Sequence, residues 1–198
     1  MLRMRVVIKF LLVAGLFFPG YALSVEQEYI EKGDRGIEEY RVGNLVPAMQ
    51  LLAESAEKGY APAQSTLAYI LDKAEENDAA FSLFGLSARQ GYAPAQLGLG
   101  LMYASGEGTL KDLRLAGQWI TKSAAQNHIP AVRIYAFAME SGDLGFQQNL
   151  QQAFLRFSQC HEAGDTVCTR RLVQAYRFGD LGQPIDMKKA SELYQLLN

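Results

Sequence analysis

One serine in this chain of 198 residues has the sequence context of a catalytic nucleophile. Ser55 and Lys58 match the Ser-x-x-Lys pattern, in which a lysine assists attack by the serine hydroxyl. Neither a Ser-Asp-Asn nor a Lys-Thr-Gly motif accompanies the pattern. The hypothesis that the protein is an enzyme acting on cell-wall peptides or related acyl compounds therefore depends on a single motif.

Cysteine, histidine and glycine offer little further chemistry. Cys160 and His161 are adjacent, but a structural zinc site normally needs four such ligands close together. The other histidine, His128, belongs to no His-Glu-x-x-His motif. Gly106 and Gly108 lie between two helical patterns, whereas a nucleotide-binding loop joins a strand to a helix. We expect no catalytic residue, no metal site and no cofactor.

A helix, a glycine-containing turn and a second helix occupy residues 95–126, and the rest of the chain repeats this unit. In each helix, small and large apolar residues fall on one stripe of a 3.6-residue period. Gly106 and Gly108 end the first helix, and the Asp112 carboxylate is placed to cap the second. The two stripes consist of Ala95, Leu99, Gly100 and Tyr103, and of Ala116, Trp119, Ile120 and Ala124.

The end of each second helix recurs as an anchor. The anchors lie 32, 36 and 37 residues apart, at Gly59, Gly91, Asn127 and Gly164. Glycine and asparagine both tolerate the left-handed conformation that ends a helix. A proline follows three residues after each of the first three anchors, where it suits the first turn of a helix. Because a two-helix unit cannot bury its apolar face alone, the copies must stack.

This repeated pattern resembles the Sel1-like repeat, a relative of the tetratricopeptide repeat. The resemblance extends over residues 26–198 and is strongest over residues 95–125. The matching residues there are Leu99, Gly100, Tyr103, Gly106, Gly108, Asp112, Ala116, Trp119, Ala124 and Ala125. Leu115 replaces the usual lysine, Met139 takes a tyrosine position, and residues 73–78 lack the glycine turn.

Periodicity and resemblance both imply an all-α fold, an α-α superhelix of about five helical hairpins. The approximate units are 26–60, 61–92, 93–128, 129–165 and 166–198. We expect helices at 25–41, 44–58, 62–74, 78–90, 94–105, 112–126, 130–141, 149–163, 166–178 and 186–197. Gly33 and Gly36 should interrupt the first helix, and Asn44 should cap the second.

Residues 1–22 have the layout of a secretory signal peptide. Three basic residues precede an apolar run from Phe10 to Phe18, and small residues follow, as at a cleavage site. The run is too short for a membrane span, and no cysteine follows it that could carry a lipid. The mature chain, 23–198, should be periplasmic or secreted, without a transmembrane span. Loss of the three basic residues takes the net charge from −2 to −5, which argues against a nucleic-acid partner.

Cys160 and Cys168 occupy two positions that carry small residues in the other units. The equivalent pairs are Ser55 with Ala63, Ser87 with Ala95, and Ser123 with Ala131. Small residues let antiparallel helices approach to the Cα separation of about 4.4–6.8 Å that a disulfide needs. In an oxidising compartment the two cysteines should be joined; a reduced core pair and a redox-active dithiol are the alternatives. The spacing also resembles that of the cysteine-rich secreted branch of the family, whose hairpins are stapled in this way.

A helical solenoid offers a concave surface, lined by first-helix residues that stacking leaves free. By analogy with tetratricopeptide repeats, these are Tyr69, Asp72, Leu97, Leu101, Arg133, Phe137, Glu140, Arg170, Gln174 and Arg177. The apolar members would anchor a partner, and the arginines would pair with its acidic groups. The alternative is that Leu97, Leu101 and Phe137 pack as ordinary core.

The family resemblance implies a protein-binding role without turnover, as a periplasmic adaptor or regulator. A narrower version is an immunity protein that inhibits a toxic effector. The alternatives are a β-lactamase-like or cell-wall-acting enzyme, and an envelope component that binds peptidoglycan or polysaccharide. The fold does not select among these roles, because function resides in the site.

Overall fold

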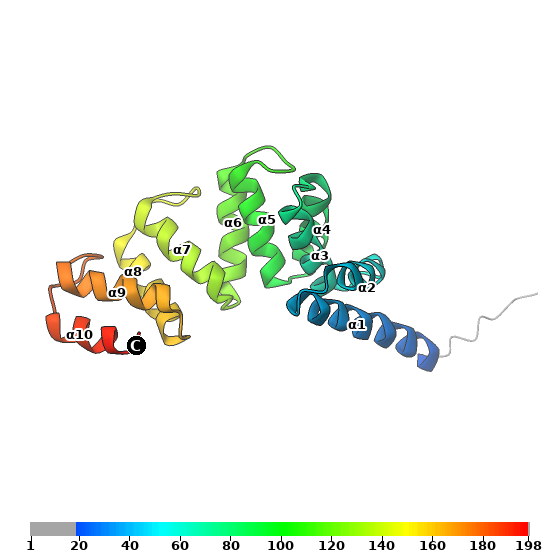
Figure 1. Cartoon of the computed structure of the whole chain (residues 1–198). Helices are drawn as coiled ribbons and strands as arrows, with labels where there is room; N and C mark the ends of the chain where they lie inside the picture. Colours follow the sequence, from blue (N-terminus) through cyan, green and yellow to red (C-terminus); the bar gives the residue numbers. More distant parts are fainter. Residues whose placement is uncertain (1–18, 198) are drawn as a thin grey trace, which may run out of the picture.

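The computed structural model describes residues 19–197, and this part of the chain forms ten helices and no strand. The helices follow one another as antiparallel hairpins along an arch (Figure 1). Their bounds are α1 Pro19–Arg41, α2 Leu45–Glu57, α3 Ala61–Lys73, α4 Asn77–Arg89, α5 Ala93–Ser105, α6 Leu113–Ala125, α7 Ile129–Ser141, α8 Leu150–Glu162, α9 Thr166–Phe178 and α10 Met187–Gln195. The expected all-α stack of five helical hairpins is confirmed.

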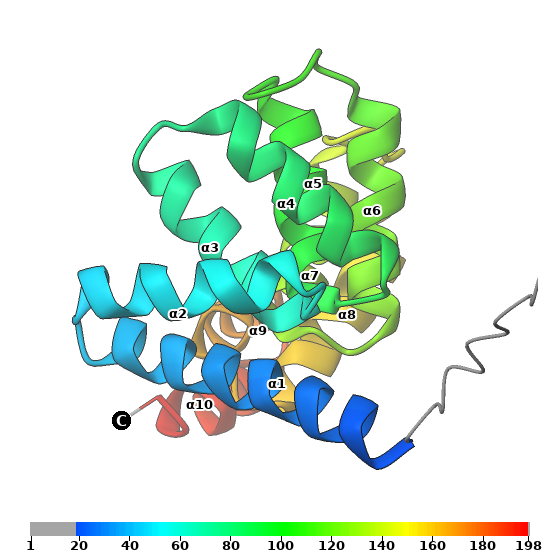
Figure 2. The same cartoon turned by 90° about the vertical axis from the view of Figure 1, so that its right-hand side faces the viewer.

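Each helix packs against its neighbours in sequence, and this order of contacts builds the array. The two helices of a hairpin pack together, and the second of them packs on the first helix of the next hairpin. Odd-numbered helices also contact one another, α1 with α3 and α3 with α5, which places them on the inner side of the curve. The superhelical twist is visible in Figure 2, where α1 and α2 run crosswise to α5 and α6.

Helix ends follow the expected signals, with one exception. Positive φ angles between 59° and 91° occur at all four anchors, Gly59, Gly91, Asn127 and Gly164. Side chains cap the N-termini of the last three even helices and of α9: Asp112, Asn149, Asp186 and Asp165. Asn44 precedes α2 but does not cap it, because its Nδ2 donates to Glu39 Oε2 at 2.7 Å. This charge-assisted bond replaces the expected cap.

The first helix, α1, is continuous, so the expectation that Gly33 and Gly36 interrupt it is wrong. Both glycines are buried against α2. A Cβ on Gly33 would lie 2.5 Å from Ser55 Oγ, and a Cβ on Gly36 would lie 2.9 Å from Leu52 Cγ. The two glycines therefore let α1 and α2 pack closely, and this packing outweighs the low helix propensity of glycine.

Small buried residues hold the two helices of each hairpin together. Three serines donate 2.7 Å Oγ hydrogen bonds to carbonyl oxygens of the preceding helix: Ser55 to Tyr29, Ser87 to Ala61, and Ser123 to Ala93. At the equivalent position of the fourth hairpin, Cys160 of α8 is instead bonded to Cys168 of α9, in the next hairpin, with Cα atoms 6.0 Å apart. The expected disulfide is confirmed, and both residues are fully buried.

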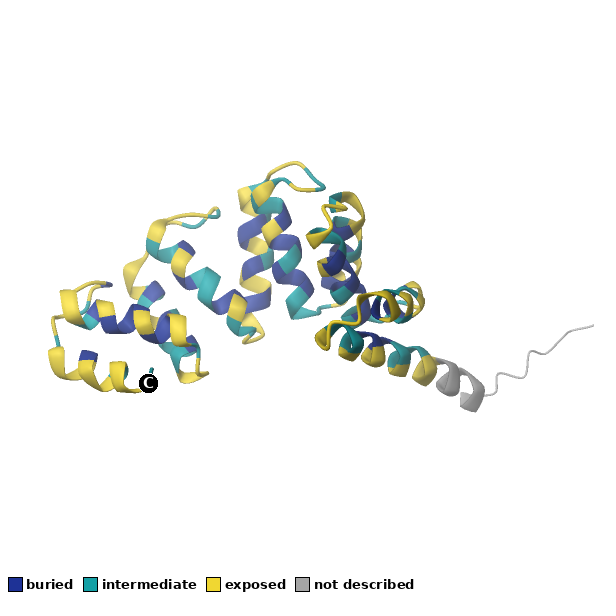
Figure 3. Cartoon of the chain, viewed as in Figure 1, coloured by how far each residue is buried: buried dark blue, intermediate teal, exposed yellow. Residues whose placement is uncertain are grey.

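Buried positions are distributed along the array, with six in each of α3, α5 and α9. Figure 3 shows these dark blue positions where helices face one another, while the loops are mainly exposed. In α10, only Ala190 is buried among the residues described. Leu181, in the loop between α9 and α10, has a φ of 52° and yet is fully buried in one core with Leu172 and Phe157. The last hairpin is therefore closed partly by a loop side chain.

The expected signal peptide falls mainly outside the described residues, because residues 1–18 are not among them. Residues 19–22 begin α1. Between residues 19 and 197, no helix has both the length and the apolar character that crossing a bilayer requires. The disulfide in the core is typical of proteins from an oxidising compartment.

Candidate functional site

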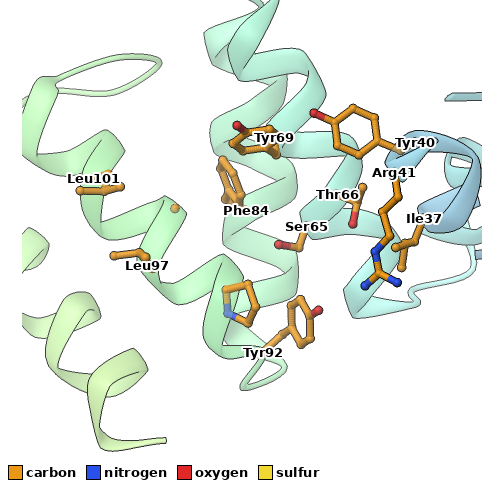
Figure 4. Close-up of a pocket in the computed structure, with 12 residues that line it drawn as sticks. Ile37, Tyr40, Arg41, Ser65, Thr66, Tyr69, Phe84, Tyr92, Leu97 and Leu101 are labelled. Atoms are coloured by element: carbon orange, nitrogen blue, oxygen red, sulfur yellow. The ribbon is translucent and has the colours of Figure 1, made fainter. Parts of the chain in front are cut away.

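A cavity of about 460 Å³ opens between α1, α3 and α5, on the inner side of the array. Figure 4 shows the side chains that line it. The α1 and α3 residues are Ile37, Tyr40, Arg41, Ser65, Thr66 and Tyr69. The remaining residues, from α4 to α5, are Phe84, Tyr92, Pro94, Leu97, Gly98 and Leu101. We term this cavity the α1–α3–α5 groove; its volume is within the range of small-ligand sites.

The walls of the groove are mainly apolar and aromatic. Tyr40 and Tyr69 lie edge to face, with ring centroids 6.3 Å apart. Phe84 contributes a nearly buried ring, which lies against Gly98. A Cβ on Gly98 would come within 2.5 Å of that ring. The bare backbone at Gly98 thus admits the Phe84 ring, which takes the place of a side chain there.

Ser65, Thr66 and Arg41 interrupt this apolar lining, and of these the Thr66 hydroxyl donates to the Pro62 carbonyl oxygen of its own helix. Ser65 is 5% exposed, and its hydroxyl makes no side-chain hydrogen bond with any of the described residues. In Figure 4 this hydroxyl points from α3 into the groove. Arg41 is the only charged residue in the lining, and its side chain is 71% exposed. Within residues 19–197 its one ion pair is a 3.5 Å contact with Glu38 of the same helix.

Tyr92 lies near Arg41 at one end of the groove (Figure 4). Burial raises the pKa of the Tyr92 phenol, and the positive charge of Arg41 opposes this rise. The phenol is therefore a neutral hydrogen-bond donor at physiological pH. The groove combines an apolar interior with the Ser65 hydroxyl and with a cation and a phenol at one end.

Three of the ten residues expected on the concave surface lie together in this groove: Tyr69, Leu97 and Leu101. Tyr69 and Leu101 are exposed. Leu97 is only 8% exposed and belongs to a core with Ile120, so it is not a free surface position. It is buried because the next hairpin packs over it. Asp72, near the end of α3, does not line the groove.

The three expected residues of α7 lie outside the groove. Arg133 Nη1 lies 2.7 Å from Asp165 Oδ2, and Glu140 binds Arg171 of α9. The expectation that Arg133 is free to pair with an acidic group of a partner is therefore wrong, because Asp165 already supplies that group. Phe137 is exposed and lines a second cavity, of about 450 Å³, between α5 and α7.

The basic residues expected near the C-terminus lie in a third hollow. Arg170, Gln174 and Arg177 are exposed on α9 and line a cavity of about 310 Å³ with Tyr194. Seven of the ten expected concave residues are thus distributed over three separate hollows, and Asp72, Arg133 and Glu140 line none of the three. The ten residues do not form one continuous site.

The sequence candidates for catalysis have structural roles. Ser55 is fully buried, and its Oγ donates to the Tyr29 carbonyl oxygen. Cys160 is held in the disulfide, and His161 Nδ1 lies 2.9 Å from Thr169 Oγ1. In the described part of the chain, no three His, Cys, Asp or Glu side chains come together as a metal site requires.

Comparison with solved structures decides the family. The fold superposes on the crystal structure of a Sel1 repeat protein from Oxalobacter formigenes with a TM-score of 0.74 and 30% sequence identity, over 83% of this chain and 66% of that chain. The chain belongs to the Sel1-like repeat family.

A second structure has the same Sel1-like repeat fold. It is a protective antigen present in uropathogenic Escherichia coli strains, matched with a TM-score of 0.75 and 20% identity, over 88% of this chain and 38% of that chain. This Sel1-like repeat chain therefore spans only part of either matched protein. No protein-family model and no curated protein matched it.

None of the residues predicted for the concave surface lies on the α1 side of the groove. An irregular first helix, interrupted by Gly33 and Gly36, has no predicted repeat register. The necessary signal was present: Ile37, Tyr69 and Leu101 are spaced by 32 residues, the same interval as between the first two anchors. All three residues line the groove. Counting back one repeat from Tyr69 would have located its α1 wall.

Proposed function

We propose that this Sel1-like repeat protein is exported and binds a protein partner through the α1–α3–α5 groove, as a non-enzymatic adaptor or regulator. The observation that carries this proposal is the groove itself, an apolar cavity of about 460 Å³ on the inner side of the array. Partner side chains that enter this groove lose much of their contact with water. Sites of this kind contribute most of the binding energy of an interface.

Two independent features support export. The N-terminal residues follow the order of a signal peptide: basic residues, an apolar run and then small residues. The Cys160–Cys168 bond is a pairing that persists in the periplasm and outside the cell but is rare in the cytosol. A periplasmic or secreted protein accounts for both features.

Binding also fits the groove better than catalysis does. Its lining contains no histidine, aspartate, glutamate or lysine that could act as a general base. Ser65 is therefore without the partner that a nucleophilic serine requires. The serine of the Ser-x-x-Lys motif is enclosed between α1 and α2.

The same groove accommodates a narrower role and one competing role. An immunity protein would use it to hold a toxic effector in a stoichiometric complex. Binding of peptidoglycan or polysaccharide is the competing role, and Tyr40, Tyr69 and Tyr92 favour it, because aromatic rings pack well against sugar rings and their hydroxyls remain available for hydrogen bonds.

Affinity capture from periplasmic extract tests the proposal. The mature protein, 23–198, is the bait, beside a Leu101→Glu variant that places a charge in the groove. The matched control is Leu110→Glu, because Leu110 is 89% exposed in the α5–α6 loop and lies outside the groove. Circular dichroism checks that both variants are folded.

The expected result is one protein retained by wild type and by Leu110→Glu, in a one-to-one complex, and lost by Leu101→Glu. Capture of the same proteins by all three baits would contradict the assignment of the groove. Sedimentation of the bait with purified sacculi, lost in the Leu101→Glu variant, would instead favour the polysaccharide role.

A further inference from the structure

We propose that the groove recognises a linear segment of the partner in which a large apolar side chain lies within two residues of an acidic one. The apolar side chain enters the groove beside Leu101 and the Tyr69 ring, and the carboxylate pairs with Arg41. This inference rests on the proposed function, because it specifies the ligand of the same groove.

The interior of the groove selects an apolar side chain. Phe84, Leu97 and Leu101 present carbon surface, and the rings of Tyr40 and Tyr69 face the same space. At about 460 Å³, the cavity holds one aromatic or branched aliphatic side chain together with its backbone, not a folded domain. A side chain that projects from an extended segment is the form of protein that fits.

The Ser65 hydroxyl gives the groove a place for the backbone of that segment. It points into the cavity and makes no hydrogen bond with residues 19–197. The hydroxyl is not among the enclosed side-chain atoms of this part of the chain that lack a partner, so it is open to water and to a hydrogen-bonding ligand from the cavity. A peptide supplies both an N–H and a C=O at the depth to which its apolar side chain enters.

Arg41 gives the groove its charge preference. It is the only charged residue in the lining, and its competing contact with Glu38 is long, at 3.5 Å, and exposed. Such a surface pair contributes little and is easily exchanged. A carboxylate from the ligand could take a charge-assisted bond from the guanidinium at the end of the groove where the Tyr92 phenol also lies. A basic ligand would meet an unfavourable charge at the same place.

Selection from a random heptapeptide library displayed on phage tests this inference on the mature protein. We expect enriched peptides to pair an aromatic or branched aliphatic residue with Asp or Glu within two positions. Selection on Arg41→Gln should keep the apolar preference and lose the acidic one. The matched control is Arg35→Gln, the same change on an exposed α1 arginine outside the groove, which should keep both.

A double-mutant cycle on the best peptide makes the test quantitative. Changing its acidic residue to the amide should weaken binding to wild type about tenfold, as expected for loss of one charge-assisted bond, and should leave binding to Arg41→Gln unchanged. Enrichment of basic peptides, equal losses on both proteins, or no enrichment at all would overturn the inference. If a captured partner failed to bind Leu101→Glu and yet bound Arg41→Gln as tightly as wild type, that result would support the proposed function and contradict the acidic motif.

Discussion

The Arg171 guanidinium of α9 holds the Glu140 carboxylate of α7 through two parallel contacts, Nη2 to Oε1 at 2.6 Å and Nε to Oε2 at 3.1 Å. The same Nη2 also contacts Asp180 in the loop that follows α9. Arg171 lies seven residues after its anchor, Gly164. The residues seven positions after the other three anchors are Thr66, Gly98 and Ile134. An ion network centred on the nearly buried Arg171 thus ties α7 of the fourth hairpin to α9 and the last loop of the fifth.

Replacing Arg171 by methionine should destabilise the protein by about 2 kcal/mol. The variant leaves Glu140 half-buried without its counter-ion, and partial access of water to Glu140 keeps the loss below that of a fully buried pair. Urea unfolding at neutral pH measures the change. Arg170→Met is the control, since Arg170 is exposed and forms no ion pair with the described residues. Equal losses in the two variants would contradict the role of the network.

The same network makes part of the stability sensitive to acid. The backbone N–H of Leu181, and then Arg171, lower the pKa of Asp180 below its ordinary value of 3.8, although burial partly opposes them. Because the folded pKa is the lower one, ionised Asp180 stabilises the fold above pH 3.8, and this contribution disappears as the pH falls below that value.

An Asp180→Asn variant should therefore be less stable than wild type at pH 7, and the difference should shrink at pH 3. Urea unfolding at the two pH values measures both differences. Asp143→Asn is the control, because Asp143 occupies the same place in the preceding loop and forms no ion pair with residues 19–197. If both variants lost stability with the same pH dependence, the contact with Arg171 would not be the cause of the loss in Asp180→Asn.

The sequence predicted the scaffold well because its signals are local. Each bound of α2 to α9 lies within one residue of its expected position, since a proline, a capping side chain or a left-handed residue marks most of these ends. The disulfide followed from the same register, which aligned Cys160 and Cys168 with three pairs of small residues. These features depend on residues that are close together along the chain.

The candidate site was predicted only in part because it depends on contacts between hairpins. Leu97 has the register of a surface residue, but the following hairpin covers it. Arg133 and Glu140 appeared free, since their partners Asp165 and Arg171 lie 32 and 31 residues further along the chain. No local sequence pattern predicts an ion pair between residues so far apart in the chain.

The disulfide can be replaced by the residues that the other hairpins use. Reduction of wild type should cost up to about 3 kcal/mol, because the unfolded chain gains the freedom of the short loop between the cysteines. A Cys160→Ser, Cys168→Ala variant recreates the Ser123 and Ala131 arrangement. Its serine can donate to the Ile129 carbonyl as Ser123 donates to that of Ala93, so it should be about 1 kcal/mol more stable than the double alanine variant.

Urea unfolding with and without dithiothreitol measures these differences. Wild type should lose stability on reduction, and neither double variant should respond to the reagent. If the serine variant were no more stable than the alanine variant, the hydrogen bond of the other hairpins would not be transferable to the fourth.

Substitutions at two loop glycines distinguish two causes of destabilisation: backbone strain, and a steric clash between neighbouring hairpins. Gly108 and Gly182 have φ angles of +64° and +70°. A Cβ on Gly108 would lie 2.3 Å from the Asn77 carbonyl oxygen of α4, whereas a Cβ on Gly182 would meet nothing within 4 Å. Gly182→Ala should cost about 1 kcal/mol from the left-handed backbone alone. Gly108→Ala should cost about 3 kcal/mol, because the two hairpins must also separate. Thermal unfolding measures both, and equal shifts in Tm would exclude the contact as a cause.

Tyr60 links the start of α3 to α1, and its ionisation reports on that link. Its hydroxyl donates to Asp34 Oδ1 at 2.7 Å, and its ring packs against the backbone of Gly33. Burial and then the Asp34 carboxylate raise the pKa of Tyr60 from 10.0 to about 12. Because the folded pKa is the higher one, the contribution of Tyr60 to stability is complete below pH 10 and is lost as the pH rises from 10 to about 12.

NMR of protein labelled with ¹³C at the tyrosine ζ carbon should show one resonance, absent from Tyr60→Phe, that titrates near pH 12. Asp34→Asn should lower this pKa only part of the way towards 10, because burial is the larger cause and the amide oxygen can still accept the hydrogen bond. Glu31→Gln, the same change at an exposed position one turn earlier on α1, should leave it in place. A Tyr60 resonance that titrates near pH 10 in the folded wild type would mean that α1 does not cover the start of α3 in solution.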